Sequence, residues 1–160
     1  MAKSCGATQP GADRFSYPVE KAIAIALEAH RGQKDKNGAP YVLHPLRMMA
    51  RMSNEAEMMA AVLHDVVEDG PGWTFERLAK EGIPADVVEA VRHLTKRPDE
   101  ENDYEAFVKR ASTNPIARRV KLADLEDNMD IRRIDAPTEK DFARLKRYRS
   151  AYALLRAQGD

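Results

Sequence analysis

Apolar residues recur at three- and four-residue steps along most of this chain, which is the spacing of an amphipathic helix and not of a strand. The first such segment runs from Pro18 to about Arg31, and Pro18 suits its first helical turn. Further segments follow at 45–53, 54–69, 74–80, 84–95, 102–112, about 115–130 and 138–157. Because no segment shows sustained strand alternation, the predicted fold class is all-α, a compact single-domain bundle of about seven or eight helices.

The breaks between these segments place several polar residues at helix ends. The segment GQKDKNGAPYVLHP is rich in Gly, Pro, Asn and Lys, and we expect it to be a loop that delivers His44 to the start of the second helix. Asn54 fits the N-cap of the segment 54–69, which ends at Gly70-Pro71-Gly72. His64 and Asp65 are therefore predicted in the last turns of one helix. The final segment carries an apolar stripe that either covers the core or forms a homodimer surface: Phe142, Leu145, Tyr148, Tyr152 and Leu155.

Composition narrows the class of protein. A chain of 160 residues fits one domain, and 43% hydrophobic with 32% charged residues suits a folded core under a charged surface. Lys plus Arg and Asp plus Glu balance at 26 each, so no overall basic field favours nucleic acid as a partner. No apolar run approaches the roughly 18 residues of a membrane span, so no membrane partner is expected.

The first sixteen residues differ from the rest of the chain. They are polar, carry the single cysteine, Cys5, and lack the apolar core of a targeting segment. We therefore expect residues 1–16 to form a flexible leader and residues 17–160 to form the domain. The expected location is the cytoplasm.

Four residues of metal-ligand type stand on the apolar or helical segments: His44, His64, Asp65 and Asp124. Two imidazoles and two carboxylates can close around one divalent cation, and a shell without thiolate disfavours a structural zinc site. Such a shell leaves coordination positions for water and a phosphate oxygen on Mn²⁺ or a similar ion. The sequence therefore predicts a metal-dependent phosphohydrolase for a phosphorylated small molecule, with Mn²⁺ as the first choice of metal.

Helix periodicity adds acidic groups beside two of these ligands. Asp69 follows Asp65 by four residues and Glu68 follows His64 by four, so each predicted ligand shares a helix face with a second carboxylate. This arrangement suits carboxylates that orient or deprotonate an attacking water molecule. Glu68 and Asp69 are therefore the candidate catalytic residues.

Each of these residues also has a purely structural explanation. A lone histidine on an apolar helix, such as His64, is more often a hydrogen-bonded core residue than a ligand. Asp65 and Asp124 could form two independent salt bridges, although a carboxylate beside an apolar run is costly to bury without a partner. Glu68 and Asp69 could form a solvated helix end, although acids there oppose the helix dipole.

Four segments together resemble a known family: AHRGQKDKNGAPYVLHPLRMM, AAVLHDVVEDG, the LTK at 94–96, and VKLADLEDNM. In this order and spacing they are similar to the HD-domain superfamily, and more specifically to the hydrolase domain of RelA/SpoT-type alarmone enzymes and the stand-alone small alarmone hydrolases. The similarity covers about residues 18–133. It implies an HD-type bundle in which the four predicted ligands hold Mn²⁺ and the two candidate acids act on the attacking water.

The resemblance also implies a reaction and residues that bind the substrate. The reaction is loss of the 3′-pyrophosphate from a (p)ppGpp-type alarmone, which yields GDP or GTP and pyrophosphate. Asn128, four residues after Asp124, matches a position that contacts the nucleotide, and Lys36 matches a basic residue of the loop before the first ligand. Thr95 and Lys96 are expected near the nucleotide or its phosphate. No region resembles the synthetase domain of these enzymes, so a dedicated hydrolase is expected.

Two departures from the family pattern leave the substrate open. The family loop usually has an Arg-Lys pair whose Arg packs on the purine, whereas this chain has Asp35-Lys36. The last motif usually reads ADRLHNM, whereas residues 123–129 read ADLEDNM. The added acids would weaken polyphosphate binding unless they face away or pair with Lys121, Arg132 or Arg133. The alternatives are hydrolysis of (p)ppApp, another nucleotide or a phosphomonoester, and a nucleotide-sensing domain without catalysis.

Overall fold

The computed structural model describes residues 18–134 and 136–157, and within these ranges it contains α-helices, two short 3-10 helices and no strand. The helices are α1 (Pro18–Ala29), α2 (Leu43–Met49), α3 (Glu55–Leu63), α4 (Val66–Asp69), α5 (Phe75–Lys80), α6 (Ala85–Leu94), η1 (Pro98–Glu100), α7 (Tyr104–Ser112), α8 (Pro115–Asn128), η2 (Ile131–Arg133) and α9 (Glu139–Ala157). The all-α prediction is confirmed. The predicted flexible leader, residues 1–16, lies outside the described residues.

Polar side chains cap the helices where the sequence signals their starts. The side chain of Asn54 accepts a hydrogen bond from Glu57 N at 3.0 Å, which confirms the predicted N-cap of α3. Asn114 caps α8 in the same way through Ala117 N at 2.9 Å, and Pro115 occupies the first helical position. These caps fix where the two helices that carry predicted ligands begin.

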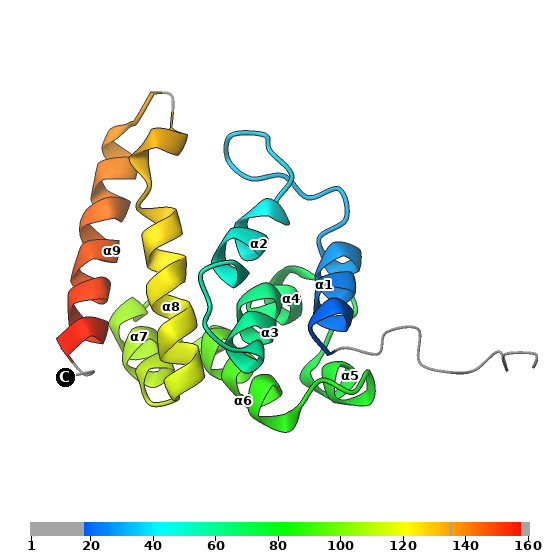
Figure 1. Cartoon of the computed structure of the whole chain (residues 1–160). Coiled ribbons are helices and arrows are strands. Elements are labelled where there is room, and N and C mark those ends of the chain that lie inside the picture. Colours follow the sequence, from blue (N-terminus) through cyan, green and yellow to red (C-terminus); the bar gives the residue numbers. More distant parts are fainter. Residues whose placement is uncertain (1–17, 135, 158–160) are drawn as a thin grey trace, which may run out of the picture.

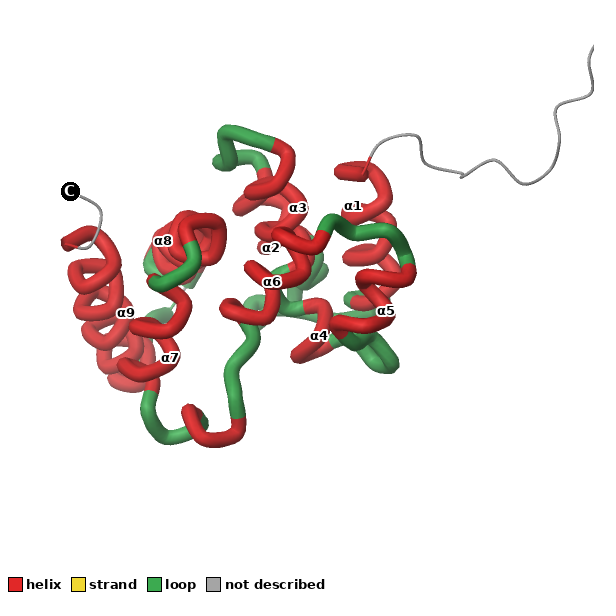
Figure 2. The backbone as a smooth tube through the Cα atoms, turned by 90° about the horizontal axis from the view of Figure 1, so that it is seen from below, coloured by secondary structure: helices red, strands yellow, loops and turns green. Residues whose placement is uncertain are grey.

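α8 is buried on two sides. Val120 and Ala123 belong to a core cluster shared with α1, α3 and α6, whereas Leu122 and Leu125 belong to a second cluster shared with α7 and α9. Figures 1 and 2 show α8 between α9 on one side and α2 and α3 on the other. A helix in this position has little surface left for solvent, so several of its polar residues are buried as well: Lys121, Asp124 and Asp127. These groups need partners inside the protein.

α9 packs along α7 and α8 and thereby covers the second core cluster (Figure 1). Leu155 is fully buried, and Tyr148 and Tyr152 pack against the cluster. Phe142, at the start of the predicted apolar stripe, is 52% exposed. Of the two roles predicted for this stripe, covering the core is the one that the structure shows, and a homodimer remains a prediction.

The prediction of one helix over 54–69 is wrong, because two helices meet at His64 and Asp65. Asp65 has φ −104° and ψ 0°, in the bridge region between helix and strand. Its carboxylate accepts a hydrogen bond from the hydroxyl of Tyr41 and lies 2.8 Å from Nε2 of His64. In a continuous helix the two side chains would diverge by roughly 100°. The local break lets them meet instead.

The second helix also differs from its prediction, since it runs from Leu43 to Met49 and not over 45–53. The reason lies in the residue that caps the next helix. Asn54 must be extended to act as an N-cap, with φ −144° and ψ 164°, so the chain leaves the helix before reaching it. The intervening residues form a turn in which Met52 N donates to Met49 O at 3.0 Å.

The loop between α1 and α2 and the connection from α8 to α9 lie at the same end of the molecule (Figure 1). Gly38, with φ 82°, supplies the left-handed backbone that the tip of the loop requires. Asp35 Oδ1 accepts hydrogen bonds from the backbone N–H groups of Asn37 and Ala39, and Asn37 Nδ2 donates to Arg133 O. The expected loop before His44 is therefore confirmed, and it is tied to η2. Among the described helices, none has both the length and the apolar character needed to cross a bilayer.

Candidate active site

Three of the predicted ligands, His44, His64 and Asp124, come together from α2, the end of α3 and α8. One ligand atom of each lies within 4.8 Å of the others, and none of the three residues is more than 7% exposed. The two imidazole centroids are 5.3 Å apart, and His44 Nε2 is 3.3 Å from Asp124 Oδ1. Two ring nitrogens and a carboxylate oxygen therefore converge on one buried point.

The fourth predicted ligand, Asp65, lies beside this cluster. Its Oδ2 is 2.8 Å from His64 Nε2 and accepts the hydrogen bond from Tyr41. Burial acts to raise the pKa of the Asp65 carboxyl, but His64 and the Tyr41 hydrogen bond outweigh burial and lower this pKa to about 2. Asp65 is therefore an anion at neutral pH, held next to the three clustered donors.

Asp124 is held by neighbours on its own helix. Lys121 Nζ donates to Asp124 Oδ2 at 2.8 Å, and Asn128 Nδ2 donates to Asp124 Oδ1 at 2.5 Å. Burial acts to raise the pKa of the Asp124 carboxyl, yet the attraction of Lys121 and the hydrogen bond with His44 hold it well below its usual range. The predicted pairing of Asp124 and Asn128 on one side of the helix is confirmed.

The donor set and its charge fit a divalent cation. Imidazole nitrogens and carboxylate oxygens suit first-row metals such as Mn²⁺, and no thiolate lies among the four residues. With both imidazoles neutral, as metal binding requires, Asp65 and Asp124 contribute two negative charges and Lys121 one positive charge, which leaves a net charge of −1. A dication at this point would offset an excess of negative charge in a buried place.

Asp127, one helical turn after Asp124, is 2% exposed and fully partnered. It accepts a hydrogen bond from His44 Nδ1 at 2.7 Å, and Arg47 and Arg133 donate to its two oxygens. Burial acts to raise the pKa of the Asp127 carboxyl, but the hydrogen bonds from His44 and Arg47 hold it well below its usual range. Arg133, one of the partners predicted for the added acids of this motif, therefore pairs with Asp127.

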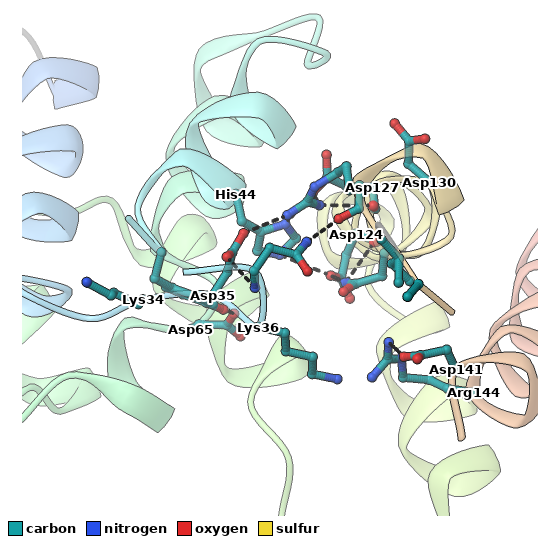
Figure 3. A pocket seen from close by; sticks show the side chains of 16 residues that line it. Lys34, Asp35, Lys36, His44, Asp65, Asp124, Asp127, Asp130, Asp141 and Arg144 are labelled. Carbon is teal, nitrogen blue, oxygen red and sulfur yellow. Dashed lines mark hydrogen bonds and ion pairs between the residues drawn. The ribbon is translucent and has the colours of Figure 1, made fainter. Parts of the chain in front are cut away.

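Two pockets open on either side of the ligand cluster. The larger, of about 860 Å³, is lined by three of the predicted ligands, His44, Asp65 and Asp124 (Figure 3). The smaller, of about 450 Å³, is lined by His64 and again by Asp65. Asp65 is therefore common to both pockets, and the cluster forms the border between them.

The two candidate catalytic acids lie on α4, just beyond the cluster. Glu68 lines the smaller pocket, and its Oε2 accepts a hydrogen bond from Lys96 N at 3.3 Å. Burial and the nearby Asp65 raise the pKa of the Glu68 carboxyl, and the same two causes raise that of Asp69. The backbone carbonyl of Asp69 accepts a 2.8 Å hydrogen bond from Gln33 Nε2, which ties α4 to the α1–α2 loop.

Three of the four residues expected to bind the substrate line one of the two pockets, and Thr95 lines neither. Lys36 and Asn128 line the larger pocket, and Figure 3 shows Lys36 pointing across it toward Arg144. Lys96 lines the smaller pocket, where its Nζ donates to Glu101 O at 2.8 Å. The hydroxyl of Thr95 donates to a backbone carbonyl of α6 at 2.9 Å.

Sequence reasoning missed two residues that contact the predicted ligands, Tyr41 and Asp127. Asp127 follows Asp124 by three residues, one turn further along α8, and Tyr41 precedes His44 by three residues at the end of the α1–α2 loop. That spacing is a signal, but it does not reveal which ligand each would contact. Tyr41 reaches Asp65, and Asp127 reaches His44 on another helix.

Comparisons with known proteins agree with this geometry. A family model described as HD domain matches residues 22–143. The guanosine-3′,5′-bis(diphosphate) 3′-pyrophosphohydrolase of Haemophilus influenzae is 39% identical over 118 residues, which are 66% of this chain and 17% of that protein. The bifunctional (p)ppGpp synthase/hydrolase SpoT of Escherichia coli is 37% identical over 123 residues, which are 69% of this chain and 17% of that protein. The alignments span 8% to 17% of the length of these and other curated relatives.

The fold has a solved counterpart. A structure described as a metazoan ortholog of SpoT that hydrolyzes ppGpp matches with a TM-score of 0.72 and 28% identity, over 93% of this chain and 88% of the other. The family match covers more than half of the sequence and includes all four predicted ligands. The chain therefore belongs to the HD domain family.

Proposed function

We propose that this protein is a Mn²⁺-dependent hydrolase that removes the 3′-pyrophosphate from (p)ppGpp-type alarmones and yields GDP or GTP and pyrophosphate. The observation that carries the proposal is the buried donor cluster at the border of two pockets, with Asp65 common to both. Such a site suits a substrate with a nucleotide on one side of the scissile bond and a diphosphate on the other. The names of the relatives support the same substrate class, since they describe (p)ppGpp hydrolases.

In this proposal the metal is held by His44, His64, Asp65 and Asp124. When bound, the ion supplies Lewis-acid polarisation of the phosphate and offsets the charge that repels a nucleophile. Asp65, the fourth residue that would hold the ion, has its Oδ2 2.8 Å from His64 Nε2. Lys121 lies beside Asp124 as a buried cation that limits the negative charge of the donor set.

Glu68 and Asp69 orient the attacking water and take up its proton. Both carboxyls follow the ligand doublet on the single turn of α4, and Glu68 faces the smaller pocket. The raised pKa values of the two carboxyls fit this task, because a stronger conjugate base accepts a proton more readily near neutral pH.

Lys36 and Asn128 bind the nucleotide side of the substrate in the larger pocket, and Lys96 serves the phosphate side in the smaller pocket, next to Thr95, whose hydroxyl is hydrogen-bonded to α6. Lys36 has no hydrogen-bond or ion-pair partner among the described residues, so its ammonium group is available to a phosphate. Arg144, by contrast, is already paired with Asp141 at 2.7 Å. On the nucleotide side, Lys36 is therefore a cation without an ion pair among the described residues.

The base is the part of the substrate that the pocket specifies least. Asp35, at the position of the family's purine-packing Arg, turns its carboxylate to the backbone of its own loop and to Arg133, 3.1 Å away. It therefore offers no cation to a purine ring. An adenine alarmone, (p)ppApp, is the second candidate, and Asp35 is the observation that favours testing it.

The test is release of pyrophosphate from ppGpp and from ppApp, with and without Mn²⁺. The wild-type chain is compared with the double variant His64→Ala, Asp65→Ala. A matched control, Glu89→Gln with His93→Gln, removes an acid and an imidazole that pair at 3.3 Å on α6, away from the ligand cluster. We expect Mn²⁺-dependent release that the site variant loses and the control retains. If the metal-loaded wild-type chain releases pyrophosphate from neither compound, the proposal is wrong, and a sensor domain or another phosphate substrate takes its place.

A further inference from the structure

The carboxylate of Asp127 is 2% exposed and is surrounded by arginine side chains. Arg47 Nε donates to Oδ1 at 2.8 Å, and Arg47 Nη2 donates to Oδ2 at 2.9 Å. Arg133 Nη1 donates to Oδ2 at 2.6 Å. Two guanidinium groups thus bind one carboxylate from two sides, and the bidentate Arg47 contact fixes its plane.

Arg51 Nη2 lies 3.8 Å from Oδ1 as a further cation, and Asp127 also contacts a predicted metal ligand. His44 Nδ1 lies 2.7 Å from Asp127 Oδ2. An ionised carboxylate can only accept hydrogen bonds, so this contact requires the proton of His44 to be on Nδ1. In a neutral imidazole the lone pair is then on Nε2.

The other face of the ring completes the geometry. His44 Nε2 is 3.3 Å from Asp124 Oδ1, and the His44 ring meets the His64 ring edge to face at 5.3 Å. In the neutral ring that a metal requires, the nitrogen that carries the lone pair therefore faces the cluster of donor atoms, while the protonated nitrogen faces Asp127. Figure 3 shows His44, Asp124 and Asp127 side by side along one edge of the larger pocket.

We infer that Asp127, held by Arg47 and Arg133, is a positioning residue that sets the tautomer and the ring orientation of His44 for metal binding. The inference rests on the proposed metal site but not on the proposed substrate. A carboxylate that receives the second ring N–H of a metal-binding histidine raises its basicity as a ligand and fixes its orientation. Loss of such a partner costs about 10- to 100-fold in metal affinity or activity.

The experiment measures Mn²⁺ binding to the metal-free protein by titration calorimetry, so the result does not depend on any substrate. Asp127→Asn keeps the shape of the side chain and removes its charge. We expect its Kd for Mn²⁺ to rise about 10- to 100-fold. Glu126→Gln is the matched control, because Glu126 is the neighbouring acid of α8 and its carboxylate contacts Tyr152 and not His44. The control should bind Mn²⁺ like the wild type.

Arg47→Met provides a second variant if Asp127→Asn does not fold. The Arg47 side chain is 37% exposed and does not touch His44, so its loss loosens Asp127 and leaves the hydrogen bond to His44 possible. We expect an intermediate loss of Mn²⁺ affinity. If Asp127 had only a structural role, its substitution would lower the thermal stability but leave the Kd of the folded protein for Mn²⁺ unchanged. Circular dichroism measures the first quantity and calorimetry the second.

The outcomes separate this inference from the proposed function. Mn²⁺ affinity that is unchanged in a folded Asp127→Asn chain, beside a wild type that binds, overturns the inference alone. Wild-type protein that binds no Mn²⁺ overturns both. Weaker Mn²⁺ binding in the variant, together with no turnover of alarmones by the wild type, supports the positioning role of Asp127 and overturns the proposed substrate. Where turnover is present, the variant's kcat should recover at saturating Mn²⁺ with an unchanged KM for the nucleotide.

Discussion

Gly70 is the position at which a single methyl group should disturb both stability and the candidate catalytic acids. It follows Glu68 and Asp69 directly and ends α4. Its φ of −91° and ψ of 114° are open to any residue, so Gly70→Ala meets no backbone penalty. A Cβ here would lie 2.5 Å from Val66 O and 2.8 Å from the Cβ of Ala29 on α1. The expected effect is therefore entirely steric.

Neither of these two contacts can be relieved by rotating a side chain. One partner is a backbone carbonyl that also accepts the hydrogen bond from Gly70 N at 2.9 Å, and the other is the Cβ of an alanine that is 5% exposed. α4 must therefore move away from α1. Overpacking of this kind costs about 1–3 kcal/mol, and a weakened hydrogen bond adds about 1 kcal/mol. We expect a loss of about 2–4 kcal/mol, which lowers the Tm of a chain of this size by roughly 5–15 °C.

Thermal unfolding followed by circular dichroism measures the loss, and pyrophosphate release measures the effect on Glu68 and Asp69. Gly82→Ala is the control, because Gly82 has φ 84° and open space around the added methyl group. Its cost of about 1–2 kcal/mol comes only from the left-handed backbone, and its kcat should not change. A Gly70→Ala chain with a wild-type Tm, or with a Tm loss no larger than that of the control and unchanged kcat, would refute the steric reasoning.

Three further predictions concern contacts away from Gly70. Tyr41→Phe removes the hydroxyl that donates to Asp65 and should lower the free energy of unfolding of the metal-free chain by about 1.5–3 kcal/mol, as measured by urea unfolding. An unchanged urea midpoint would contradict this prediction. Glu100→Gln should destabilise the chain at pH 7 and reduce its loss of stability on acidification. The hydrogen bond from Arg110 lowers the pKa of Glu100, so this stabilisation is present above the unfolded-state pKa and is lost as pH falls through the folded-state value; equal pH dependence in variant and wild type would disprove it. Leu125 is fully buried between α7, α8 and α9, so Leu125→Ala should lower the free energy of unfolding by about 2–5 kcal/mol in the same urea assay. A loss below about 1 kcal/mol would contradict close packing of α9 on this residue.

The sequence predicted those parts of the fold that local chemistry decides. Asn54 caps α3 because its short side chain reaches a backbone N–H three residues on, and this depends on nothing outside the segment. Asp124 and Asn128 meet for the same reason, since a spacing of four residues places them on one helix face. The meeting of His44, His64 and Asp124 was predicted from the residue types and from the family resemblance, and packing of three separate elements produces it.

The break between α3 and α4 could not be predicted from the same local pattern. The run AAVLHDVVED has helical spacing throughout, and nothing in it stops a helix at His64. The contact that accompanies the break comes from Tyr41, which lies 24 residues earlier on the α1–α2 loop and donates to Asp65. Tertiary contacts thus override local propensity at the position where two ligands must meet.

The two charge departures from the family motifs are best understood together. Considered one at a time, Asp35 and Asp127 each add a negative charge near a predicted polyphosphate site. In the structure the guanidinium of Arg133 binds both, although Asp35 and Arg133 are 98 residues apart, and Arg47 supplies a second cation to Asp127. Arg51, 3.8 Å from Asp127 Oδ1, adds a third cation to this group. Both carboxylates are therefore paired within the protein, and neither of them pairs with Lys36. An ion pair between distant segments produces no periodic pattern in a sequence. The pairing of Arg133 with Asp35 and Asp127 is therefore visible only in the folded chain.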